Sequence, residues 1–159
     1  MLYPSKTFKV NPFYRMLYET IFDVVNQDKS PLLKALLKES FGNQKTLSLD
    51  QFEFNELIET MIINLEKELS NFHYEDIQLK INIHPRTVAI RKEFHKAKRK
   101  SMLTNISFRI SKDTVQKIHK LKQNTLGEVI ELAIGLFILS CDDLIFDLIL
   151  LSVKHQDAN

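Results

Sequence analysis

The stretch that decides the fold is TNISFRISKDTVQKIHKLKQNTLGEVIELAIGLFIL, residues 104–139. It opens with polar and apolar residues in alternation, which is typical of a strand with one buried face. Two helical patterns follow, separated by a polar break at 123–125. A strand this short, with no partner strand beside it in sequence, cannot stand alone. We therefore expect it to pair with the same strand of a second copy and form a two-stranded ribbon.

The second helical pattern, over about 126–140, is apolar on nearly all sides. A helix of this kind must be buried all round. Two small helices and one strand cannot cover it within one chain, so the sequence predicts an intertwined dimer. The expected dimer core consists of Ile106, Phe108, Ile110, Val129, Ile130, Ala133, Ile134 and Phe137.

The first half of the chain is expected to form a helical unit. Asn11-Pro12 is typical of a helix start, and further helical patterns follow at about 31–40, 51–71 and 86–100. Alternation over 77–83 predicts one strand, which the proline at position 85 ends. No internal repeat is evident.

These patterns predict a mainly α protein with short β segments, organised in three parts. Residues 1–95 form a helical unit of unknown role that is available to a protein partner. Residues 96–103 form a basic linker, and residues 104–159 form the dimerisation domain, with an extra helix over about 144–153.

Positive charge is concentrated in one segment. Residues 96–123 carry nine Lys or Arg against one Asp or Glu, whereas the whole chain has a net charge of only +2. Such focusing is typical of a nucleic-acid binder, and a solvated bridge between two units is the alternative. The expected contacts to DNA phosphates are Lys96, Lys98, Arg99, Lys100 and Lys112.

The segments FRIS (108–111) and TLGEVIELAI (125–134) resemble the ribbon-helix-helix family of DNA-binding proteins, over about a quarter of the chain. The resemblance implies a dimeric ribbon-helix-helix domain in which Asn105, Ser107 and Arg109 contact base edges in the major groove. It also implies that backbone N–H groups around Thr125 and Leu126 hold a phosphate. The sequence departs from the family at three places: the turn between the helices lacks glycine, Gly127 lies in the first turn of the second helix, and Glu131 replaces a basic residue common in the family.

The expected function is that of a sequence-specific DNA-binding homodimer, or a higher oligomer, that acts on double-stranded DNA as a transcriptional repressor. A relaxosome accessory protein and an antitoxin are alternatives with the same ribbon. A third alternative is a protein-interaction dimeriser that does not bind DNA.

Other classes of function find little support in the sequence. The five histidines are scattered and the lone Cys141 cannot complete a zinc site, so no metal or other cofactor is expected. Phosphate-loop and nucleophile-elbow motifs are missing, so we do not expect an enzyme. The most apolar window, 132–141, is too short to span a bilayer, and no secretory signal is evident. We therefore expect a cytoplasmic protein without a membrane partner.

Overall fold

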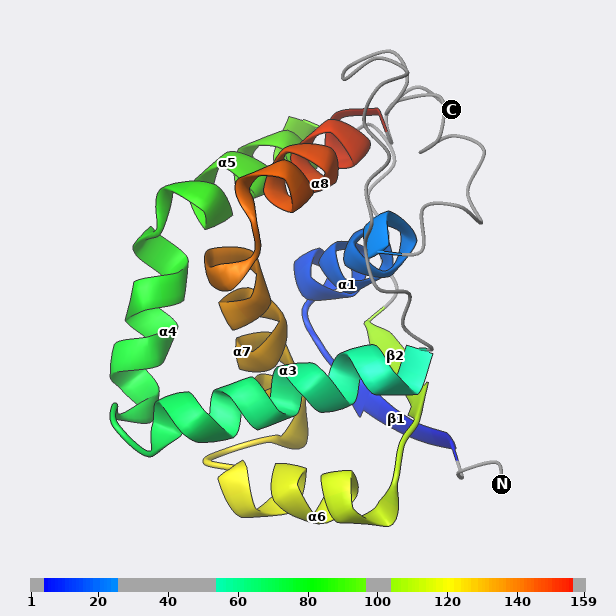
Figure 1. Cartoon of the computed structure of the whole chain (residues 1–159), viewed down its shortest axis with the longest axis vertical. Helices are drawn as coiled ribbons and strands as arrows, with labels where there is room; N and C mark the ends of the chain where they lie inside the picture. Colours follow the sequence, from blue (N-terminus) through cyan, green and yellow to red (C-terminus); the bar gives the residue numbers. More distant parts are fainter. Residues whose placement is uncertain (1–4, 26–53, 97–103, 156–159) are drawn as a thin grey trace.

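The computed structural model describes residues 5–25, 54–96 and 104–155. These residues form a mostly helical structure with one two-stranded antiparallel sheet (Figure 1), which confirms the mainly α prediction with short β segments. The elements are β1 (Ser5–Lys9), α1 (Pro12–Val25), α3 (Phe54–Leu69), α4 (Tyr74–Ile83), α5 (Pro85–Lys96), β2 (Asn105–Arg109), α6 (Lys112–Leu121), α7 (Leu126–Ser140) and α8 (Asp143–His155). The predicted helix at 31–40 lies outside the described residues.

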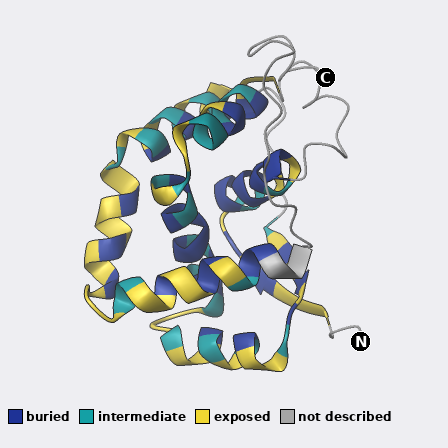
Figure 2. Ribbon diagram, viewed as in Figure 1, coloured by how far each residue is buried: buried dark blue, intermediate teal, exposed yellow. Residues whose placement is uncertain are grey.

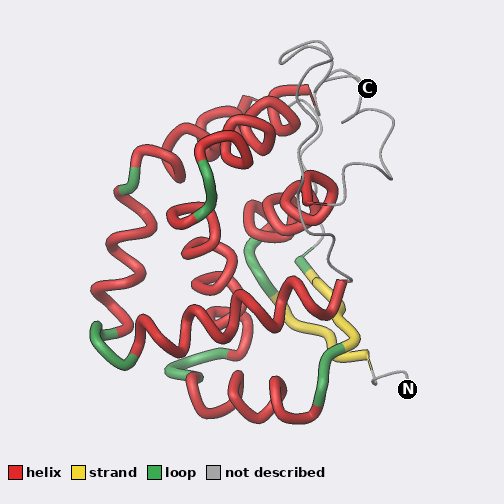
Figure 3. The backbone as a smooth tube through the Cα atoms, in the orientation of Figure 1, coloured by secondary structure: helices red, strands yellow, loops and turns green. Residues whose placement is uncertain are grey.

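Strand β2 has its partner within the same chain. It pairs with β1 in antiparallel register, and the two strands lie side by side at one edge of the molecule (Figure 3). This corrects one expectation, because β1 of the same chain, and not a second copy, supplies the partner of β2. Strand β1 was not predicted because Phe8 is the one buried residue among its five, while Lys6 on the same face is exposed, so no alternation is visible.

A short repeat accompanies the two strands. TFKVN (7–11) and SFRIS (107–111) match residue type by residue type at a separation of 100 positions. Both copies run from a strand into a helix cap: the Asn11 side chain accepts a hydrogen bond from Phe13 N (3.0 Å), and the Ser111 hydroxyl accepts one from Thr114 N (3.2 Å). The expectation of no internal repeat is therefore wrong.

The second helices repeat as well. ELIE (56–59) lies in the first half of α3, and EVIE (128–131) occupies the corresponding positions of α7. The two helices pack directly on each other, α3 also contacts β2, and α7 also contacts β1. Among the described elements, the order strand, helix and helix thus occurs twice, as β1–α1–α3 and β2–α6–α7. Because Thr7 pairs with Ser107, its own counterpart in the repeat, a pseudo-twofold axis passes through the middle of the ribbon.

Helix α7 is buried by other parts of the same chain. It packs against α1, α3, α4, α5 and α6, and Figure 2 shows it as a largely buried helix in the middle of the molecule. Of the eight residues predicted for a dimer core, seven are buried in the single chain and Phe137 is partly buried. Residues before 96 and after 104 share one hydrophobic core. The burial of α7 therefore does not require a second copy.

The predicted strand at 77–83 is instead part of helix α4. Ile77 and Ile81 are four residues apart and both are buried, whereas Leu79 and Ile83 are exposed. The buried pair therefore forms one face of a helix and not one face of a strand. Glu75 and Asp76 lie in the first turn of α4, where their negative charges suit the positive end of the helix dipole. Within the described residues, no helix has the length and apolar content needed to cross a bilayer.

Candidate nucleic-acid interface

The outer side of the ribbon carries six exposed polar side chains, which we call the ribbon face. They are Ser5, Thr7 and Lys9 from β1, and Asn105, Ser107 and Arg109 from β2. At its centre the Thr7 and Ser107 hydroxyls share a hydrogen bond of 2.8 Å. Lys9 lies opposite Asn105 at one end, and Arg109 lies opposite Ser5 at the other. The pseudo-twofold axis exchanges these two ends.

The structure brings together the three predicted base-contacting residues, Asn105, Ser107 and Arg109, on one exposed face. Sequence reasoning missed the other half of that face, which β1 supplies. The match between TFKVN and SFRIS is the signal that could have found it, because it places Lys9 where the second copy has Arg109. The face therefore has a cation at each end rather than one alone.

The inner side of the ribbon is held against the core by aromatic packing. The Phe8 and Phe108 ring centroids lie 6.0 Å apart, and Tyr18 of α1 meets Phe108 edge-on at 5.0 Å. The Arg15 side chain donates a hydrogen bond from Nε to the Asn105 carbonyl oxygen (2.7 Å), which satisfies a polar group at the edge of β2. The ribbon face is thus presented on a packed support.

A groove of about 590 Å³ runs beside β1. The end of β1 and the start of α1 form one wall, and the first turn of α7, with Thr125 and Leu126, forms the other. Thr125 caps α7, because its hydroxyl accepts a hydrogen bond from Glu128 N at 3.2 Å. The predicted phosphate-binding residues therefore lie in the same groove as Lys9, at the positive end of a helix dipole.

Gly127 allows β1 to approach α7. A Cβ atom at this position would lie 1.8 Å from the Lys9 carbonyl oxygen, far inside any real contact. The glycine in the first helical turn, a departure from the family pattern, is therefore a packing requirement of the joint between the two units.

Glu131, the third departure from the family pattern, forms a hydrogen bond with a distant part of the same chain. Its Oε2 atom accepts a hydrogen bond from Asn11 N (2.7 Å), and its counterpart Glu59 accepts one from Ser111 N through Oε1 (3.0 Å). Burial raises the pKa of Glu131, and the Asn11 N–H opposes that rise. Each glutamate thus holds the strand-to-helix joint of the opposite unit, and we call the two contacts the glutamate latches.

The predicted phosphate contacts outside the groove are placed unevenly. Lys112 is exposed at the start of α6, three residues after Arg109. Lys96 ends α5, which lies away from the ribbon in Figure 1, and forms an ion pair with Glu93 at 3.7 Å. The expected contacts Lys98, Arg99 and Lys100 lie outside the described residues.

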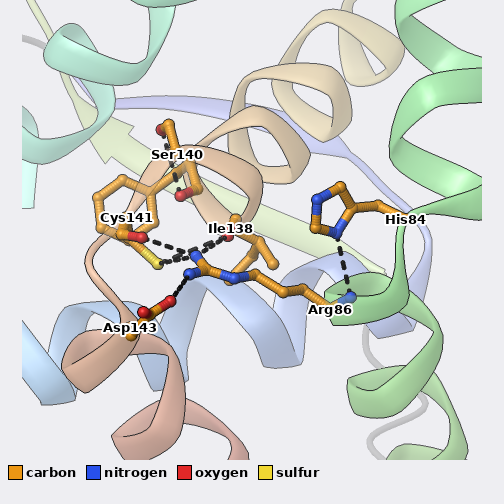
Figure 4. A network of polar contacts seen from close by, with 7 residues as sticks. His84, Arg86, Ile138, Ser140, Cys141 and Asp143 are labelled. Carbon is orange, nitrogen blue, oxygen red and sulfur yellow. Dashed lines mark hydrogen bonds and ion pairs between the residues drawn. The ribbon is translucent and has the colours of Figure 1, made fainter.

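A second polar cluster, centred on Arg86, joins three helices (Figure 4). The guanidinium of Arg86 donates from Nη1 to the carbonyl oxygens of Ile138 (3.0 Å) and Cys141 (2.6 Å), and from Nη2 to the carboxylate of Asp143. It also lies over the Phe146 ring, 4.9 Å from the centroid. A cation at the C-terminus of α7 caps open carbonyls and suits the helix dipole, so this cluster ties α5, α7 and α8 together.

The Arg86 cluster also includes the free cysteine Cys141. Burial raises the pKa of the Cys141 thiol to about 11, against the opposing effect of Arg86, so the thiol is not activated. No group of three or more metal-ligating side chains occurs within the described residues. No family model, no curated protein and no solved structure matches the chain.

Proposed function

We propose that this chain binds double-stranded DNA in a sequence-specific manner through the ribbon face and acts as a transcriptional repressor. The observation that carries the proposal is the ribbon itself: two paired strands with an exposed polar face and a cation at each end. A two-stranded ribbon of this kind fits the major groove, where arginine suits guanine and asparagine suits adenine. The groove beside β1 supplies a helix N-terminus for a neighbouring phosphate.

The duplicated architecture extends the resemblance to the ribbon-helix-helix family. The resemblance rested on residues 104–139, whereas β1–α1–α3 repeats the same order of elements and the same ELIE/EVIE segment. One chain therefore supplies both strands that a dimer of the family would supply. A homodimer of the present chain would carry two ribbons, suited to two adjacent sites on DNA.

A ribbon made by a single chain has two unequal ends, so the DNA sequence that it binds should also have two unequal halves. One end offers Lys9 and Asn105, and the other offers Arg109 and Ser5. Lysine is a point charge, whereas arginine donates two parallel hydrogen bonds, so the two ends favour different bases. We expect the bound sequence to be an imperfect palindrome with the stronger guanine preference on the Arg109 side.

A protein-interaction module that does not bind DNA is now less favoured. Two features of the sequence favour it: β2 has only one arginine, and Glu131 is acidic where many members of the family carry a basic residue. Lys9 adds a second cation to the face, and Glu131 is engaged by Asn11. Relaxosome and antitoxin roles use the same ribbon chemistry and remain alternatives to repression.

Selection of bound duplexes from a random pool tests the proposal. We expect an enriched imperfect palindrome, and Arg109→Ala and Lys9→Ala should each weaken binding to it by about 1–3 kcal/mol. Lys92→Ala is the matched control, because Lys92 is an exposed lysine of α5, away from the ribbon (Figure 1). Binding that depends equally on all three residues, or no enrichment together with weak binding at low salt, would overturn the proposal.

A further inference from the structure

Exposed apolar side chains are concentrated in one part of the described chain. The large apolar residues that are exposed come from α3, from the turn that follows it, from α4 and from the start of α5, and they are Ile63, Phe72, Leu79, Ile83 and Val88. Among the described residues, the ribbon and helices α1, α6, α7 and α8 contribute none. Apolar residues scattered singly over a surface need no explanation, whereas a group of them marks an interaction site.

Helix α4 carries the two most exposed members of this group. Leu79 and Ile83 are 59% and 66% exposed, and they lie about one turn apart. Because an α-helix turns by about 100° per residue, they lie on the side opposite the buried pair Ile77 and Ile81. We call the side made by Leu79 and Ile83 the α4 face. A helix that is apolar on two opposite sides is typical of one that is covered on both.

The α4 face lies away from the ribbon. In Figure 1, α4 and the two strands lie at opposite ends of α3, and Figure 2 shows exposed residues on the outward side of α4. Helix α4 packs against α3, α5 and α7, and these contacts leave Leu79 and Ile83 open. A contact through the α4 face would therefore leave the ribbon face free.

Charged side chains of both signs flank the α4 face. Asp76 and Lys80 are four residues apart and lie on one flank, whereas Glu75 lies on the other. All three are exposed, and none of them forms an ion pair with another described residue. The Lys80 ammonium lies 5.7 Å from the centroid of the Phe72 ring, so a further exposed apolar side chain lies beside the first flank.

This pattern of charge complements a second copy of the same helix. When two identical helices pack antiparallel about a twofold axis, the same flank of each lies beside the same flank of the other. With the axis near the middle of α4, Asp76 of each copy then lies beside Lys80 of the other. Parallel packing would instead place Asp76 beside the partner's Glu75, which is repulsive. A partner with charges of only one sign would match only one of the two charges on the flank.

From these observations we infer that the α4 face is a dimer interface, at which two copies of this chain pack antiparallel through Leu79 and Ile83. Two ion pairs between Asp76 and Lys80, one at each end, fix the direction of the contact. The inference concerns self-association and does not depend on DNA binding. In such a dimer both ribbon faces remain open.

Sedimentation of the full chain at increasing concentration tests the apolar contact. We expect a monomer–dimer equilibrium, and Leu79→Asp and Ile83→Asp should each raise its dissociation constant at least about tenfold, because each buries a charge in the interface. Ile63→Asp, which changes an exposed apolar residue of α3, is the matched control and should leave the constant unchanged. Circular dichroism verifies that each variant keeps its helices, as expected for changes at exposed positions.

Charge reversal tests the antiparallel direction. Asp76→Lys and Lys80→Asp each bring like charges together across the interface and should weaken the dimer about three- to tenfold. The double variant restores both pairs and should dimerise as the native chain does, and an equimolar mixture of the two single variants should form a heterodimer. A chain that stays monomeric would show that a different partner covers the α4 face. That result, a dimer insensitive to both apolar changes, or a double variant no stronger than the single ones would each overturn the inference.

Discussion

Glu131 of α7 accepts a hydrogen bond from the backbone N–H of Asn11, 120 residues away in sequence, at 2.7 Å. The same contact occurs in the other unit between Glu59 and Ser111. Each latch joins the N-cap of a first helix to the second helix of the opposite unit. The two units are therefore interlocked in the way that two copies of an intertwined dimer would be.

Removing a latch should loosen the joint between the units. Glu131→Ala and Glu59→Ala should each lower the free energy of unfolding by about 1 kcal/mol, because one partly exposed hydrogen bond to a backbone N–H is lost. In a chain of this length that corresponds to a fall of about 2–4 °C in Tm. Thermal melts followed by circular dichroism measure the effect, and the matching Gln variants, which keep an acceptor, should lose less. Equal losses for Ala and Gln would contradict a hydrogen-bond role.

The half-buried carboxyl of Glu131 should make stability depend on pH. Burial raises its pKa above the ordinary value of 4.5, so the folded chain binds this proton more tightly than the unfolded chain does. Stability from this group therefore rises as the pH falls from neutrality through the raised pKa towards 4.5. The Tm of the native chain relative to Glu131→Gln should increase over that window in paired melts. A difference that stays constant from neutral to acidic pH would count against the burial of a charged Glu131.

Gly127 should not accept any side chain. Alanine normally stabilises a helix by up to about 1 kcal/mol relative to glycine, but here its Cβ would overlap the Lys9 carbonyl oxygen. Gly127→Ala should therefore destabilise the fold, by about 1–3 kcal/mol in chemical denaturation. Gly135→Ala is the comparison, since its Cβ would meet the Ile81 side chain at 2.7 Å rather than a backbone oxygen at 1.8 Å, and it should cost less. Stabilisation by Gly127→Ala would rule out the close approach of β1 to α7.

Arg86 should stabilise the fold through its forked geometry rather than its charge alone. Arg86→Lys keeps the cation but loses the parallel donors and the flat contact with Phe146, so it should cost about 1.5–3 kcal/mol. Urea denaturation measures the loss, and Arg91→Lys, another ring-stacked arginine, provides a comparison. A Lys variant as stable as the native chain would show that charge alone is enough.

Cysteines at the centre of the ribbon should report which chain supplies the partner strand. Thr7 and Ser107 lie directly opposite each other, and such pairs are close enough for a disulfide. After mild oxidation, Thr7→Cys/Ser107→Cys should migrate as a monomer on a non-reducing gel, with the two single variants as controls. A disulfide-linked dimer of the double variant alone would show that β2 pairs with a second copy.

The sequence predicted those elements whose own residues show a clear alternating or helical pattern. Strand β2 and helices α6 and α7 all form where alternation, helical periodicity and the polar break at 123–125 indicated. Alternation misled at 77–83, because Ile77 and Ile81 also lie on one helical face, which is the face that is buried.

The sequence by itself determined that an alternating strand must find a partner and that an apolar α7 must be buried on every side. Only the tertiary structure decided that both needs are met within one chain. Pairing over 100 residues depends on β1, whose five residues carry one buried side chain, and on hydrogen bonds such as that between Asn11 and Glu131. Contacts between distant segments leave no periodic trace in either segment. The likeness of TFKVN to SFRIS is a trace of the partner strand in the sequence, whereas the pairing itself became visible only in the fold.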